Sequence, residues 1–102
     1  MVHVLAIITA KPGLRSDILS IFQLNVSFVK AESGCIEYGA TVDAKDAPAF
    51  QTPWGLDTFV VIEKWESMDA LKAHAAAPHM TAYGAKTKEM IASRVVHIMS
   101  SV

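Results

Sequence analysis

Residues 57–83 read DTFVVIEKWESMDALKAHAAAPHMTAY, and this stretch contains the change from strand pattern to helix pattern that decides the fold. Successive side chains of a strand point to opposite faces, so alternate residues share a surface. One face of this predicted strand combines apolar side chains with a carboxylate and an indole: Phe59, Val61, Glu63 and Trp65. The opposite face carries Val60, Ile62 and Lys64. The strand is therefore expected to end with a polar group beside an aromatic ring.

A helix is predicted directly after this strand. Ser67 is a typical N-cap residue because its hydroxyl accepts a hydrogen bond from a free backbone N–H, which places the helix start at about Met68. Pro78 restrains the preceding residue from helical geometry and is favoured at the first position of a new helix. We therefore expect His74 to end one helix and His79 to begin the next.

The first third of the chain shows the same two patterns. Residues 2–10 are apolar on both alternating sets, which is typical of a strand covered on both faces. From Leu14 the spacing becomes helical up to about residues 32–34, where Gly34 can supply a left-handed cap. The apolar stripe of this helix is predicted to comprise Leu14, Ile18, Ile21, Phe22, Phe28 and Val29.

The middle of the chain is predicted to be a strand followed by a long loop. Residues 35–43 alternate, and Gly39 within them suggests a bulge or a close backbone approach. Residues 44–56 follow neither period and contain two prolines and a glycine, which predicts a loop with Phe50 and Trp54 as apolar anchors. A loop of this length can act as a lid.

A further helical segment up to about residue 92 and a strand over 93–101 complete the order β-α-β, β-α-β. This order predicts a single α+β domain over residues 1–102, with a ferredoxin-like, antiparallel four-stranded sheet and its helices on one face. The strands at 2–10 and 58–62 are apolar on both faces, and the chain has no element left to cover the far side. A second copy of the sheet would cover it, so a homodimer is predicted.

The composition argues against a nucleic-acid partner, a disulfide-bonded protein and a membrane protein. Nine basic and ten acidic residues give a net charge of −1, without a Lys/Arg cluster that would neutralise phosphates, so no nucleic-acid partner is predicted. The single cysteine, Cys35, allows neither an internal disulfide nor a CxxC pair, which favours a cytoplasmic protein. No apolar run approaches the ~20 residues of a membrane span, so no membrane association is predicted.

Four short motifs follow one another along the chain: Pro12-Gly13, AESGCIEY at 31–38, FVVIEKWES at 59–67, and the pattern His74…Pro78-His79. In order and spacing they resemble the antibiotic biosynthesis monooxygenase family over nearly the whole chain. The resemblance implies a dimeric α+β barrel, with sheets packed together and a pocket between helices and sheet. It also implies a cofactor-independent monooxygenase that oxidises a quinol-like or polycyclic phenolic molecule with O2. An isomerase or a non-catalytic ligand-binding dimer of the same fold is the alternative.

Three residues are predicted to be catalytic: His74, Trp65 and His79. Oxygenation without a cofactor requires a group that removes a phenolic proton, and imidazole suits this because it titrates near neutral pH. His74 is the predicted base, whereas His79 either assists or only caps its helix. The two histidines lie five residues apart around a proline and would point about 140° apart on one helix, so neither an HExxH site nor any other metal site is predicted. Trp65 either walls the pocket or packs in the core.

The predicted substrate-binding residues are Asn25, Tyr38, Phe59, Glu63, Met80 and Tyr83. Glu63 needs a partner if buried, either as an ion pair or hydrogen bond, or as an acid with a raised pKa. Asn25 either orients a substrate oxygen or packs against a helix. Core packing explains Tyr38 and Tyr83 equally well, and it is the favoured interpretation of Met80. The pocket is expected to be lined by Phe59, Trp65, His74, His79 and Tyr83, with the 44–56 loop near its mouth.

Overall fold

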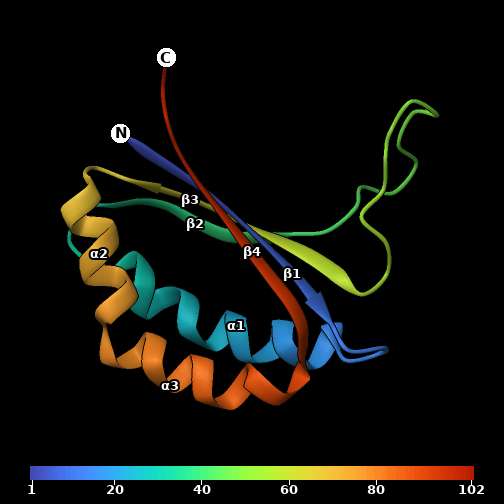
Figure 1. Cartoon of the computed structure of the whole chain (residues 1–102), viewed down its shortest axis with the longest axis horizontal. Helices are drawn as coiled ribbons and strands as arrows, with labels where there is room; N and C mark the ends of the chain where they lie inside the picture. The colour runs from blue at the N-terminus through green and yellow to red at the C-terminus, as the bar shows by residue number, and fades with distance from the viewer.

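Four strands form one antiparallel sheet in the computed structural model, which describes residues 1–102. In the order β2-β3-β1-β4 they are β2 (Cys35–Thr41), β3 (Thr58–Trp65), β1 (Val2–Ala10) and β4 (Ile91–Ser100). The helices are α1 (Arg15–Lys30), α2 (Met68–Ala76) and α3 (Pro78–Thr87), and a 3₁₀ turn, Lys88–Met90, leads into β4. All three helices lie on one side of the sheet (Figure 1). This confirms the predicted ferredoxin-like architecture. No helix combines the length and apolar character needed to cross a membrane.

The core lies between the sheet and the helices. Alternate residues of β1, from Val2 to Ala10, are buried toward the helices, and the residues between them are half-buried on the other face. The largest fully buried side chains are Trp65, Phe22 and Phe59. Burying a side chain of this size stabilises the fold by about 1.5–3 kcal/mol relative to leaving it in water. The predicted division of β3 into two faces is confirmed, since Phe59, Val61, Glu63 and Trp65 all contribute to this layer.

The opposite face of the sheet has no covering element within the chain (Figure 1). Leu5 and Ile7 of β1 lie on it, and the β4 residues paired with them are His97 and Val95. Val95 keeps 47% of its surface exposed. The face is therefore apolar and open, as the two-sided pattern of β1 indicated.

The junction of strand and helices follows the predicted signals. The Ser67 hydroxyl accepts a 3.1 Å hydrogen bond from the Ala70 N–H at the start of α2. Ala77 is extended, with φ −65° and ψ 140°, and Pro78 begins α3. The chain therefore changes direction between His74 and His79, and the two rings need not follow the geometry of one continuous helix.

The turn after α1 depends on Gly34. Its φ is +84°, and its carbonyl accepts a 2.8 Å hydrogen bond from the Glu66 N–H. A Cβ at this position would lie 2.6 Å from the Cβ of Ala70. Glycine is thus required here by both the backbone conformation and the approach of α2.

Two local predictions were wrong. Phe28 does not belong to the buried stripe of α1 and is largely exposed, because six residues at 100° each place it roughly 120° from Phe22. The irregularity of β2 lies between Cys35 and Glu37 instead of at Gly39. Gly39 pairs regularly with Ile62, and a Cβ there would meet nothing within 4 Å.

The long loop is not anchored by its aromatic residues, which corrects the prediction. Phe50 is 88% exposed and Trp54 is 55% exposed. Instead, the Asp43 carboxylate holds the loop by accepting 2.9 Å hydrogen bonds from the Trp54 and Gly55 N–H groups. These two hydrogen bonds, that from Trp54 first, lower the pKa of Asp43. In Figure 1 the loop projects beyond the sheet, away from the helix layer.

Candidate active site

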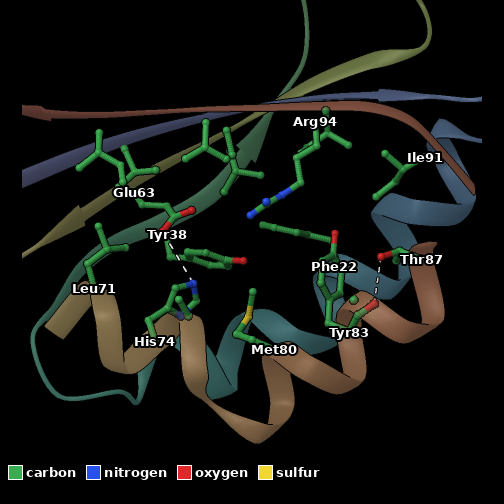
Figure 2. Close-up of a pocket in the computed structure, with 18 of the residues that line it drawn as sticks. Phe22, Tyr38, Glu63, Leu71, His74, Met80, Tyr83, Thr87, Ile91 and Arg94 are labelled. Carbon is green, nitrogen blue, oxygen red and sulfur yellow. Dashed lines mark hydrogen bonds and ion pairs between the residues drawn. The ribbon is translucent and has the colours of Figure 1, made fainter. Parts of the chain in front are cut away.

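A cavity of about 740 Å³ opens between the helix-facing side of the sheet and helices α2 and α3. Figure 2 shows side chains from both layers converging on this space. Of its 21 lining residues, 14 are hydrophobic. Small-molecule sites typically have volumes of about 300–1,000 Å³ and largely apolar walls with a few polar groups. The cavity therefore has the size and character of a site for a small organic ligand.

Three aromatic rings form one end of the cavity wall. Phe22 stacks on Tyr38, with ring centroids 5.2 Å apart, and meets Tyr83 edge-on at 6.0 Å. Burial raises the pKa of Tyr83 to about 12, although Arg94 opposes the rise. Burial also raises the pKa of Tyr38, and the neighbouring Glu63 raises it further. Both phenols are therefore neutral hydrogen-bonding groups at physiological pH.

Glu63 brings a carboxyl group into this wall from β3. It is buried, and its Oε1 accepts a 3.0 Å hydrogen bond from Nε1–H of Trp65. Burial raises the pKa of Glu63, while this hydrogen bond, His74 and Arg94 act against the rise. The residue thus combines the two possibilities considered from the sequence, a hydrogen-bonded carboxyl and an acid with a raised pKa.

His74 projects from the last turn of α2 and is buried against two aromatic rings. Its ring lies 4.6 Å from that of Trp65 and 5.5 Å from that of Tyr38, between centroids. Its Nε2 lies 3.8 Å from Oε1 of Glu63, and this separation is too long for a direct hydrogen bond. Nε2 is therefore available to a ligand in the cavity.

Arg94 enters the cavity from β4, and the sequence interpretation missed it. Figure 2 shows its guanidinium pointing into the space between Glu63 and Tyr83. It takes part in none of the ion pairs of the chain. Arg94, Val96 and Ile98 occupy every second position of β4, so the sequence predicts that they share one face of the strand. The sequence did not reveal that this face points into the cavity.

The predicted site residues separate into three groups. Five line the cavity: Tyr38, Glu63, His74, Met80 and Tyr83. Phe59 and Trp65 lie behind its wall, so the expectation that they line it was wrong. The reason is full burial: Phe59 lies against Phe22, and Trp65 lies against His74.

Asn25 and His79 form the third group and line a smaller hollow of about 230 Å³ between α1 and α3. The Asn25 amide N–H donates to Sδ of Met80 at 3.4 Å, so it is engaged in helix packing. His79 lies outside the main cavity because the chain turns at Ala77 before α3 begins. No residue of the 44–56 loop lines the cavity, so the loop is not at its mouth as expected.

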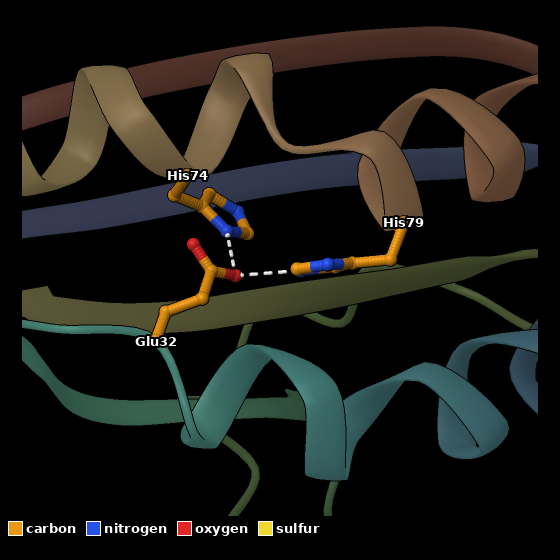
Figure 3. Close-up of side chains that lie close together, drawn as sticks. All are labelled: Glu32, His74 and His79. Atoms are coloured by element: carbon orange, nitrogen blue, oxygen red, sulfur yellow. Dashed lines mark hydrogen bonds and ion pairs between the residues drawn. The ribbon is translucent and has the colours of Figure 1, made fainter.

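A third residue, Glu32, joins the two histidines (Figure 3). Its Oε2 lies 2.9 Å from Nδ1 of His74 and 2.8 Å from Nε2 of His79. The nitrogen and oxygen atoms of these three side chains that are able to coordinate a metal ion all lie within 4.8 Å of one another. Around a tetrahedral ion with bonds of about 2.0–2.1 Å, ligand atoms lie roughly 3.3 Å apart. The two separations to Glu32 Oε2, 2.9 Å and 2.8 Å, are shorter than this and are typical of hydrogen bonds.

Glu32 was missed because the contact joins distant parts of the chain. It lies within the AESGCIEY motif, 42 residues before His74 and 47 before His79. No local periodicity connects positions so far apart. Its position directly after α1 is fixed by the same turn that requires Gly34.

These observations define a ferredoxin-like α+β domain with an apolar cavity that joins a buried carboxyl, a histidine and an arginine. The model of the family described as antibiotic biosynthesis monooxygenase matches residues 1–86. The chain belongs to this family, which confirms the resemblance seen in its sequence motifs.

Individual relatives agree with this assignment. The chain is 36% identical over 101 residues to the Escherichia coli (strain K12) protein named "Probable quinol monooxygenase YgiN", covering 97% of this chain and 96% of the relative. A solved structure described as "Crystal structure of antibiotic biosynthesis monooxygenase" is 27% identical, with a TM-score of 0.81 and coverage of 100% and 99%. Rv0793 from Mycobacterium tuberculosis, 24% identical, shares the fold with a TM-score of 0.81 over 99% of this chain and 94% of that one. At the family level, the comparisons support a monooxygenase.

Proposed function

We propose that the protein is a homodimeric monooxygenase that oxidises a quinol-like or polycyclic phenolic molecule with O2 and requires no metal or organic cofactor. The observation that carries this proposal is the position of His74 Nε2 and the Glu63 carboxyl, 3.8 Å apart, at the wall of the apolar cavity. The family match and the name of the E. coli relative favour the same chemistry.

The shape of the cavity favours a flat aromatic substrate. Phe22, Tyr38 and Tyr83 offer ring surfaces on one side, and the sheet offers the small side chains Val4 and Ala6 on another. Aromatic rings prefer such offset or edge-on neighbours. The volume of about 740 Å³ accommodates one or more fused rings.

The first chemical step is removal of the phenolic proton. His74 Nε2 takes this proton, which leaves a phenolate in the cavity and an imidazolium beside Glu63. Arg94 lines the same cavity and stabilises the phenolate oxygen by its positive charge. An electron-rich phenolate is the form of the substrate that is able to reduce O2 itself.

The second step transfers one oxygen atom to the ring. The ring carbon ortho or para to the phenolate oxygen bonds to O2, and the resulting peroxide anion takes the proton back from His74. His74 then removes the hydrogen of that carbon, a C=O bond forms as the O–O bond breaks, and the proton and the leaving hydroxide combine as water. A C–H group thereby becomes C=O, O2 is reduced by four electrons, and no external reductant is consumed.

The homodimer would form through the open face of the sheet. Leu5 and Ile7 of β1 and Val95 of β4 give this face its apolar character. A twofold interface matches such a surface to itself and buries it. In such a dimer each sheet lies between its own helices and the sheet of the partner. The cavity stays open, because it lies on the helix-facing side of the sheet.

The experiment that tests this function supplies isotopic O2 to the purified protein with a panel of quinols and polycyclic phenols. We expect one labelled oxygen atom in the product, formed faster than in uncatalysed autoxidation. Equal rates with and without protein would contradict the proposal for that substrate class. An isomerase would turn its substrate over under nitrogen, whereas a binding protein would show saturable binding without turnover under either gas.

A further inference from the structure

We infer that Glu32 is a positioning residue, which holds His74 in the tautomer that keeps the lone pair of Nε2 in the cavity. This inference rests on the proposed function, in which Nε2 accepts the substrate proton. The geometry behind it is the bridge of Glu32 Oε2 to His74 Nδ1 and His79 Nε2, at 2.9 Å and 2.8 Å.

The donors in this bridge follow from the chemistry of a carboxylate. An ionised carboxylate can only accept hydrogen bonds, so both histidines must present an N–H to Glu32. For His74 the proton therefore sits on Nδ1, and a neutral ring then has its lone pair on Nε2. That lone pair faces the cavity beside Glu63. When His74 takes the substrate proton, Glu32 also stabilises the imidazolium, as a carboxylate does behind a catalytic histidine.

His79 holds the carboxylate through the same oxygen as His74, Oε2, and approaches it from another direction (Figure 3). Its ring stacks on Phe28, with centroids 6.2 Å apart, at the smaller hollow between α1 and α3. Side-chain exposure rises from 6% for His74 through 15% for Glu32 to 27% for His79. His79 therefore lies between Glu32 and solvent. Glu32 is held by hydrogen bonds to both histidines in the protein without substrate.

The test replaces Glu32 by glutamine and by aspartate in the full chain. Glu32→Gln keeps the size, but its amide N–H can donate to Nδ1 and thereby move the His74 proton to Nε2. Glu32→Asp keeps the charge and the acceptor. Glu89→Gln is the matched control, since Glu89 is an exposed glutamate outside the cavity and the cluster. Nitrogen NMR of the imidazole rings reports the tautomer of His74 without any substrate.

We expect Glu32→Gln to change the tautomer of His74 and to lower kcat by about 10²–10⁴ with little change in KM. Glu32→Asp should keep the wild-type tautomer and a kcat above that of Glu32→Gln, and Glu89→Gln should match wild type. An unchanged tautomer and kcat in folded Glu32→Gln would overturn the inference. If wild type shows no turnover, the proposed function fails, while the NMR comparison still tests the positioning.

The same cluster offers a second measurement. Titration of the wild-type protein with Zn²⁺ is expected to leave the bridge to Glu32 intact at equimolar metal. A one-to-one complex at micromolar Zn²⁺, lost in Glu32→Gln, would overturn the inference, because Glu32 would then be a metal ligand instead of a positioning residue.

Discussion

Nε2 of His74 lies 3.8 Å from Oε1 of Glu63, although the two side chains come from different layers of the fold. Both are buried, and Trp65 contacts both, through a hydrogen bond to Glu63 and through its ring to His74. At this distance and degree of burial, a positive charge on His74 favours the ionised form of Glu63 and so opposes the rise that burial causes in its pKa. The protonation of Glu63 in the cavity therefore depends on His74.

Glu63→Gln is expected to stabilise the protein increasingly as the pH rises from about 4.5, the ordinary pKa of the carboxyl. Burial raises the pKa of Glu63 in the folded state. The protonated carboxyl therefore makes its full contribution to the free energy of unfolding below pH 4.5, and this contribution is lost as the pH rises through the raised pKa. Glutamine cannot ionise and can still accept from Trp65. Urea denaturation of both proteins across this pH range measures the difference, and a difference independent of pH would contradict the expectation.

The tyrosines give a second pH-dependent prediction. The chain has two, Tyr38 and Tyr83, and burial raises the pKa of both, that of Tyr83 to about 12. We expect almost no tyrosinate absorbance at pH 10.0, where a free tyrosine is half ionised. A spectrophotometric titration measures this directly. Half ionisation of either residue near pH 10.0 in folded protein would show that its ring is solvated.

Gly34→Ala is expected to destabilise the fold. The left-handed backbone costs about 1–2 kcal/mol for a residue with a Cβ, and the clash with Ala70 adds to this cost. Gly84→Ala is the matched control, because Gly84 lies within α3 and a Cβ there meets nothing within 4 Å. That control should be stabilised by about 0.8–1.0 kcal/mol. Thermal melts compare the two, and equal stability of Gly34→Ala and wild type would contradict the account of this turn.

Much of the fold was predictable because its signals are local. Ser67 and Pro78 mark helix starts through their own backbone and side-chain chemistry, and the alternation of β1 reports its two faces directly. Phe28 was placed wrongly because apolar character was given more weight than its helical angle. Gly39 was placed wrongly because a glycine in a strand permits a bulge without requiring one.

The candidate site was predictable only in part. Tyr38, Glu63 and His74 came from alternation and motif, and they line the cavity. Glu32 and Arg94 could not be found in this way, because their importance depends on contacts between segments far apart in sequence. Whether a residue lines a cavity or lies behind its wall also depends on the neighbours that cover it.

We predict that the protein dimerises through the open face of the sheet and that a single charge introduced on this face weakens the dimer. Val95→Asp places a carboxylate on this face, and burying it in an interface is costly. We expect sedimentation to show a dimer for wild type and a shift toward monomer for Val95→Asp. Leu24→Asp, on the exposed side of α1, is the control and should remain dimeric. A wild-type monomer at micromolar concentration would contradict sheet-to-sheet assembly.

His74 is the proposed base of the oxygenation in this cavity. The most direct test compares O2 uptake with an electron-rich hydroquinone for wild type, His74→Ala and buffer, with metal-stripped protein and circular dichroism as a check of the fold. His3→Ala is a matched control, since His3 bonds to Ser101 near the chain ends and does not line the cavity. We predict that His74→Ala loses roughly 10²-fold or more of the protein-dependent rate, while His3→Ala keeps it. Equal uptake by wild type, His74→Ala and buffer across a panel of quinols would contradict this role of His74.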